Sequence, residues 1–195
     1  MKQLLFVLVA ITLFSCKDDS KVEEAVAKIP IEFKVERFDK IFYESKPEDL
    51  NKIKAQYPFF FPAGNPDSIW VNKLQNPLLK ELYKEVQMKY PTLGPVEADM
   101  EKMFAYVQYY FPKYKTPRVI TLISEVDTEA KAFYVDTLAL VSLDCYLGKD
   151  HRFYVDFPEY KKAELEENQI LPNLVSTFCY GKIAPPTDRT LLSAM

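Results

Sequence analysis

The sequence is poor in the residues on which many catalytic motifs depend. It has four glycines, and Gly64, Gly94, Gly148 and Gly181 lie far apart. Phosphate-binding loops and dinucleotide fingerprints need clustered glycines, so both are excluded. A helical zinc-peptidase motif needs two histidines on one helix face, and the chain has one, His151.

The chain also lacks a strong charge of either sign. Its formal net charge is −3, and no long run of lysine or arginine occurs. Nucleic-acid binding depends on clustered cations that displace the counterions of the phosphate backbone. We therefore expect no nucleic-acid partner.

The most apolar run is too short to span a bilayer as a helix, which takes about 20 residues. It extends from Leu4 to Phe14, follows Lys2, and leads through Ser15 into Cys16. These are the proportions of a signal peptide that ends in a bacterial lipobox. We predict a lipoprotein signal peptide at 1–15 and lipidation of Cys16, with several acyl chains for stable anchoring. An ordinary secretory peptide or an uncleaved membrane anchor is the alternative.

A polar stretch follows the cysteine and offers little to bury, so residues 16–28 are predicted to be a flexible, lipid-anchored tether. Its first residues, Lys17-Asp18-Asp19, resemble the signal that exports Bacteroidetes lipoproteins to the cell surface, although a charged spacer would look the same. The predicted location is the cell envelope, with the outer membrane favoured over the inner. The surface and periplasmic faces are both left open.

Residues 29–195 have the length of one ordinary domain. Hydrophobic periodicity predicts helices, then strands, then helices, which indicates an α+β fold with helices packed around a small antiparallel sheet. The proline-punctuated segment 57–70 is predicted to be a loop. The chain ends at 189–195 without a helix stop signal, so we expect a C-terminal truncation. The predicted helices lie at 47–57, 76–90, 95–111, 159–167 and 171–180, and the predicted strands at 29–35, 117–124, 132–135 and 138–143.

Few residues remain as candidates for chemistry. A catalytic triad could be built only around His151 with Asp150, using Ser142, Ser176 or Cys145 as the nucleophile. No serine lies in the glycine-flanked turn of a nucleophile elbow. We therefore predict that the chain is not an enzyme and has no catalytic residues.

Two further sets of residues are candidates for metal binding and for cross-linking. Asp144, Asp150, Glu125 and Asp127 match no EF-hand spacing and are interpreted as solvated turn acids rather than calcium ligands. We predict no metal site and no cofactor. A disulfide between Cys145 and Cys179 is possible outside the cytoplasm, but nothing in the sequence fixes their geometry.

Two aromatic segments could fill the core or form a docking face. They are Phe59-Phe60-Phe61 with Trp70, and Tyr109-Tyr110-Phe111. Core packing is the default interpretation, because large aromatic side chains contribute most when they are buried.

Several segments together resemble the gliding-motility lipoprotein B family (GldB-type) of Bacteroidetes. They are Arg37-Phe38-Asp39, YPFFFP at 57–62, YYFPKY at 109–114, LDCYLGKDHRFY at 143–154 and DFPEY at 156–160. The resemblance runs from about residue 30 to the end and covers the N-terminal part of longer members. It implies an acylated, non-catalytic component of surface gliding, coupled to type IX secretion, with other gliding or secretion subunits as partners.

The family is also distantly similar to zinc metallopeptidases. The helix predicted at 171–180 would take the place of the zinc helix, but LPNLVSTFCY has no histidine and no glutamate. The resemblance thus implies a degenerate zinc-metallopeptidase-like scaffold without its metal. An extracytoplasmic hydrolase and a carbohydrate- or peptide-binding lipoprotein are the alternative functions.

The segment 143–154 contains the candidate surface. We expect Gly148 to adopt a positive φ in a tight turn, with Leu147 pointing inward. Lys149, Asp150 and His151 would then point outward and form a partner-binding surface.

Overall fold

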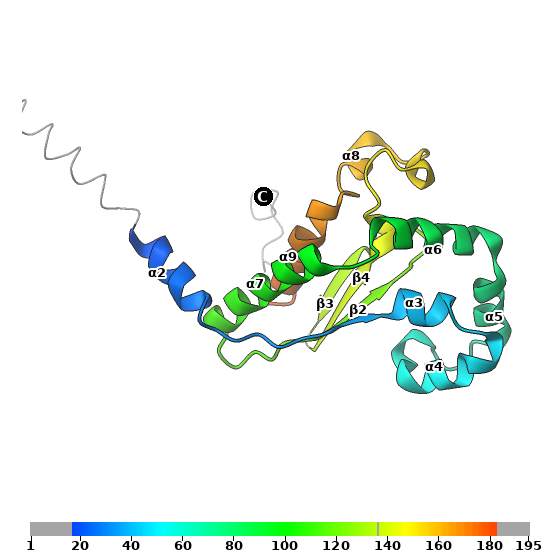
Figure 1. The fold of residues 1–195 in the computed structure, drawn as a ribbon, viewed down its shortest axis with the longest axis horizontal. Helices are drawn as coiled ribbons and strands as arrows, with labels where there is room; N and C mark the ends of the chain where they lie inside the picture. Colours follow the sequence, from blue (N-terminus) through cyan, green and yellow to red (C-terminus); the bar gives the residue numbers. More distant parts are fainter. Residues whose placement is uncertain (1–16, 136, 183–195) are drawn as a thin grey trace, which may run out of the picture.

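The computed structural model describes residues 17–135 and 137–182, which form helices around one four-stranded sheet (Figure 1). The predicted α+β class is confirmed. The helices are α2 (Lys17–Val26), α3 (Phe38–Tyr43), α4 (Leu50–Gln56), α5 (Asp67–Gln75), α6 (Pro77–Lys89), α7 (Gly94–Tyr110), α8 (Glu159–Lys162) and α9 (Ile170–Tyr180). The strands are β1 (Val35–Arg37), β2 (Arg118–Leu122), β3 (Ala132–Val135) and β4 (Leu138–Ser142).

The sheet is mixed, which corrects the prediction of an antiparallel sheet. Its strand order is β1-β2-β4-β3. Strands β1 and β2 are parallel, β2 and β4 are parallel, and β3 and β4 form the predicted antiparallel hairpin. Local sequence indicates the hairpin, but the parallel partners are far apart in the chain and carry no such signal. Asp136 lies outside the described residues.

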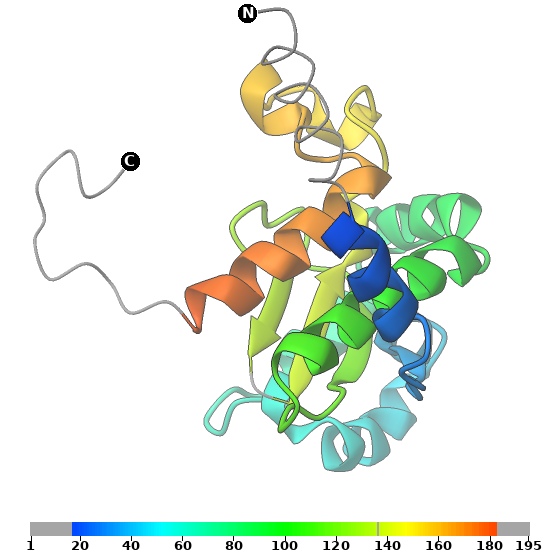
Figure 2. The same cartoon turned by 90° about the vertical axis from the view of Figure 1, so that its left-hand side faces the viewer.

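Side chains alternate along the strands, so that the two faces of the sheet pack into two separate hydrophobic cores. Val119, Ala139 and Val141 contact the larger core, which includes buried residues of α6, α7 and α9. Ile120 lies on the other face, in a smaller aromatic core with Phe38 of α3. Helices α7 and α9 therefore cover one face of the sheet, while α3 and α4 pack against the other (Figure 2).

Helix ends follow the predicted signals where these are local. The side chain of Asn76 accepts hydrogen bonds from the backbone N–H groups of Leu78 and Leu79, and Pro77 is the first helical residue of α6. This is the N-cap geometry that an Asn-Pro start favours. Near the start of the helix predicted at 47–57, the Lys46 N–H donates to the Asp49 side chain at 3.2 Å, and α4 itself begins at Leu50.

Several predicted segments differ from the structure, and the helix expected at 159–167 is shortened to α8. The strand expected at 29–35 overlaps β1 (Val35–Arg37) only at Val35, where the pairing with β2 begins. The loop expected at 57–70 ends earlier, and α5 begins at Asp67. The segment expected to be a flexible tether contains α2, which contacts α7 and buries Val26. The signal peptide, Cys16 and the chain end at 189–195 lie outside the described residues.

Candidate functional site

The predicted turn in the segment 143–154 is confirmed. Gly148 has a φ of +111°, and its N–H donates to the carbonyl of Leu165 at 3.0 Å. Leu147 is buried, as expected, and Lys149 and Asp150 are exposed. Two of the three candidate surface residues are therefore available to a partner.

The outward orientation predicted for His151 is wrong. Its side chain is 16% exposed, and Nε2 lies 3.4 Å from Oε2 of Glu85 on α6. The other ring nitrogen, Nδ1, accepts the N–H of Phe153 at 3.4 Å. The histidine is held against α6 because a carboxylate there offers it a partner. The binding role of the surface stays a prediction.

Arg152, which sequence analysis missed, makes the firmer contact with α6. Its Nη1 lies 2.6 Å from Glu81 and its Nη2 lies 2.7 Å from Glu85. The arginine holds the pKa of Glu85 below its usual range. Glu81 and Glu85 are one turn apart and so share a face of α6. In the sequence, two glutamates four residues apart on a predicted helix were the available signal that a basic side chain binds there.

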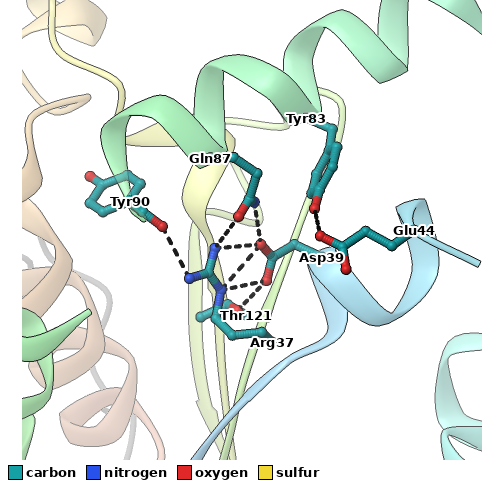
Figure 3. A network of polar contacts seen from close by, with 7 residues as sticks. All are labelled: Arg37, Asp39, Glu44, Tyr83, Gln87, Tyr90 and Thr121. Atoms are coloured by element: carbon teal, nitrogen blue, oxygen red, sulfur yellow. Dashed lines mark hydrogen bonds and ion pairs between the residues drawn. The ribbon is translucent and has the colours of Figure 1, made fainter. Parts of the chain in front are cut away.

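A second polar cluster contacts α6 on the side opposite to Glu81 and Glu85, and it lies at the end of β1 (Figure 3). Asp39 is fully buried and receives Nε and Nη2 of Arg37 at 2.9 and 2.7 Å. It also accepts Oγ1 of Thr121 at 2.5 Å and Nε2 of Gln87 at 2.9 Å. Nη1 of Arg37 continues to the carbonyl of Tyr90 at 3.1 Å. The cluster thus joins β1, α3, β2 and α6.

This arrangement is suited to holding elements together rather than to chemistry. Four donor atoms occupy both carboxylate oxygens of Asp39, and a carboxylate has about four lone-pair sites in total. Little capacity remains for a metal ion or a transferred proton. At the rim, the Tyr83 hydroxyl donates to Glu44 (Figure 3). The Tyr83 ring also stacks on Tyr43, with centroids 5.5 Å apart.

Asp144 is a buried acid, which corrects its interpretation as a solvated turn acid. It follows β4 and has no exposed side-chain surface. Its two oxygens accept the N–H groups of Ser124 at 3.0 Å and Val126 at 2.6 Å. Burial raises the pKa of this carboxyl to about 6. Asp144 therefore fixes the turn after β2, where Val126 has a left-handed φ of 60°.

The other acids considered as calcium ligands do not converge on Asp144. Glu125 forms an ion pair with Lys73, Asp127 accepts the N–H of Glu129 at 3.0 Å, and Asp150 is exposed. Within the described part of the chain, no group of three or more His, Cys, Asp and Glu residues could hold a metal ion.

The structure does not assemble the triad weighed from the sequence. Among the described hydrogen bonds, those of His151 connect it to none of Ser142, Ser176 and Cys145. The Cys145 thiol is buried, and burial raises its pKa, which favours the unreactive protonated form. Cys145 and Cys179 are both free thiols.

The sequence matches a known protein family. The family described as gliding motility protein GldB matches residues 19–195. The chain belongs to this family. No curated protein and no solved structure matches it. Across 17–135 and 137–182, no helix of this GldB-family chain is long and apolar enough to cross a membrane.

Two of the segments that carry the GldB resemblance contain buried connections. Arg37-Phe38-Asp39 supplies the polar cluster at β1. In the segment 143–154, the Tyr154 hydroxyl donates to the carbonyl of Asp144 at 2.5 Å and accepts the N–H of Leu147 at 3.0 Å. These residues hold the GldB-family fold together, and sequence reasoning had no signal for the long-range partner Gln87.

The aromatic segments divide between the two interpretations. Phe61 is buried in the smaller core, with Phe60 and Trp70 packed against it, which confirms core packing for these three, whereas Phe59 is 43% exposed. Tyr110 is 61% exposed, and its neighbours Tyr109 and Phe111 are also exposed. For this second segment the core interpretation is wrong, and a docking role stays a prediction.

Proposed function

We propose that this GldB-family chain is a lipid-anchored, non-catalytic component of the gliding motility machinery, coupled to type IX secretion. The observation that carries the proposal is the family match over residues 19–195. The lipobox supports an anchor at Cys16, with the outer membrane favoured over the inner. The partners would be other gliding or secretion subunits and, through the lipid, the membrane.

The non-catalytic part of the proposal is supported by how the reactive groups are used. His151 is held by Glu85, Asp39 has its oxygens occupied by Arg37, Thr121 and Gln87, and the Cys145 thiol is buried. Each of these three groups already serves the fold.

Deletion of the gene tests the proposed role. We expect a deletion strain to lose spreading and cell movement, and the intact gene to restore both. A deletion strain that glides normally would overturn the proposal.

The anchor is tested in the same strain. Cys16→Ser should accumulate as an unprocessed precursor without lipid mass, and it should fail to restore gliding. Cys179→Ser is the matched control, because it makes the same substitution at a cysteine that is a free thiol. If Cys16→Ser is processed and carries lipid, the anchor prediction is wrong. Protease treatment of intact and permeabilised cells then decides which membrane face carries the domain.

Charge reversal tests the partner surface at the exposed turn. Lys149→Glu combined with Asp150→Lys preserves net charge and should impair gliding while the protein accumulates normally. Normal gliding by this variant would contradict a partner role for Lys149 and Asp150. For the hydrolase alternative, purified protein and its His151→Ala and Asp150→Ala variants are compared on ester and peptide substrates. We expect no activity that depends on either residue.

A peptide-binding role is the second candidate function. It is favoured by an open apolar groove beside β3, lined by Phe133, Val135 and Tyr180.

A further inference from the structure

Strand β3 forms one end of the described sheet and hydrogen-bonds to β4. The Ser142 N–H donates to the carbonyl of Lys131 at 2.9 Å. This hydrogen bond determines which residues of β3 direct their backbone N–H and C=O groups toward β4 and which direct them away. Backbone groups of Phe133 and Val135 then face β4, and those of Ala132 and Tyr134 face away from it. An edge of this kind is a template for pairing with another strand.

A groove of about 840 Å³ runs along this edge. Its lining includes Phe133 and Val135, which are 47% and 54% exposed, and also Tyr134, which points to the opposite face of the sheet. A cavity that touches side chains from both faces of β3 must lie at the edge of the strand. Its walls are the segment after α7 and the C-terminal end of α9.

The groove has a cationic rim. Lys113, Lys115 and Lys182 are among its described lining residues, and no carboxylate is. None of these three lysines forms an ion pair with a described residue, although the chain carries a net charge of −3. The local charge is thus opposite to that of the molecule and suits an acidic occupant.

Two hydroxyl groups in the groove wall lack hydrogen-bond partners among the described residues. They belong to Tyr114 and Tyr134, and both oxygens are buried. Tyr134 is 2% exposed, so water does not hydrate its hydroxyl. Buried polar groups are normally paired, so these two unpaired hydroxyl groups lower the stability of the wall behind the groove.

We propose that an extended, acidic segment of a partner protein binds this groove by adding a strand to β3. The outer edge of β3 would supply main-chain hydrogen bonds, the aromatic wall would take the apolar side chains, and the lysines would pair with carboxylates. A second copy of the chain is a poorer occupant, because pairing β3 with β3 would bring the lysine rims together. The proposal deepens the proposed function, on which it rests for the existence of a protein partner.

The probe is a short fluorescent peptide of alternating glutamate and valine, measured by anisotropy against the full chain in neutral detergent. Two N-methylated isomers are compared, one blocking the peptide edge that faces β3 and the other the opposite edge. We expect the first to weaken binding about tenfold or more relative to the second. Equal binding by the two isomers, or no binding of the parent peptide, would overturn strand addition.

Charge is tested with variants of the protein. Lys113→Glu with Lys115→Glu should weaken the acidic peptide about tenfold, whereas Lys52→Glu with Lys80→Glu, an equal charge change at exposed lysines elsewhere, should not. An alternating lysine–valine peptide that binds equally well would contradict the acidic specificity. A dimer that forms through Lys113 and Lys115 would assign the groove to a second copy. These binding results stand apart from the deletion strain, so failure here leaves the gliding role to be judged separately.

Discussion

Helix α6 is held on two sides by charged clusters that differ in almost every physical respect. The inner cluster is centred on Asp39, which is fully buried and bonded to Arg37, Gln87 and Thr121. The outer cluster is centred on Arg152, whose side chain is 53% exposed and reaches two glutamates of α6. Both clusters have short contacts, so distance alone does not distinguish them.

The two clusters illustrate how burial determines the loss of stability when one partner of an ion pair is removed. Removing one partner of a buried pair leaves the other charge desolvated and uncompensated. An exposed pair exchanges its partner for water and salt, so little is lost when it is broken. We therefore expect the inner cluster to control folding and the outer cluster to adjust the position of the segment 148–154.

The largest expected effect is that of Asp39→Asn. It leaves the Arg37 guanidinium without its counter-charge and should lower the free energy of unfolding by about 3–5 kcal/mol. Denaturant unfolding monitored by circular dichroism measures the change. Asp67→Asn is the matched control, since Asp67 pairs with Lys54 at 2.6 Å but its side chain is 52% exposed. Equal losses in the two variants would break the distinction between buried and exposed pairs.

Asp144 sharpens the comparison, because it is a buried acid held by backbone N–H groups rather than by a cation. Its pKa is about 6 in the folded protein and near 3.8 in the unfolded chain, so between these values only the folded state keeps the proton. Stability should therefore fall as the pH rises from about 4 to about 6, and then level off. Each pKa unit corresponds to about 1.4 kcal/mol, which gives a loss of about 3 kcal/mol.

The control for this pH dependence is Asp144→Asn, in which the side chain cannot titrate. Its unfolding free energy, measured over the same pH range, should lack the decline seen in the parent protein. Parallel curves for the two proteins would show that another group is responsible.

Gly148→Val addresses the segment that carries the outer cluster, and its expected effect is smaller. A valine at a φ of +111° is strained, and this costs about 2 kcal/mol. The cost comes from the backbone, because the nearest atom to an added Cβ is 3.9 Å away. Gly94→Ala is the control, since its added Cβ meets open space and its φ is not positive. Thermal unfolding should separate the two variants, and similar melting temperatures would contradict the turn geometry.

Arg152→Ala should have the smallest effect. The melting temperature should fall less than in Gly148→Val, and the difference from the parent protein should vanish in about 1 M salt, which screens exposed charges. If the difference persists in high salt, the outer cluster is more than a screened surface contact.

The sequence predicted those features that a few neighbouring residues determine. Asn76-Pro77 starts α6 because the asparagine can reach the next two N–H groups without help from other parts of the chain. Gly148 adopts its positive φ for an equally local reason. Helix α5 was missed, although Asp67 in its first turn was an available signal.

The features that failed to be predicted depend on distant residues. Arg37 and Asp39 reach their partners Thr121 and Gln87 only after β1 has paired with β2. No local sequence pattern therefore predicts the buried cluster. Asp144 looked like a surface acid until the turn after β2 supplied two N–H donors. The parallel pairing that corrected the sheet has the same cause, since its partners are joined by long connections.

Helix α2 has a mechanical consequence for an anchored domain. It begins at Lys17, directly after the predicted lipidation site, and Val26 at its other end is buried. A helix rises 1.5 Å per residue, so its ten residues form a strut of about 15 Å. A lipid on Cys16 would then hold the domain at a defined height above the bilayer, and a lateral pull on the domain would reach the membrane with almost no slack.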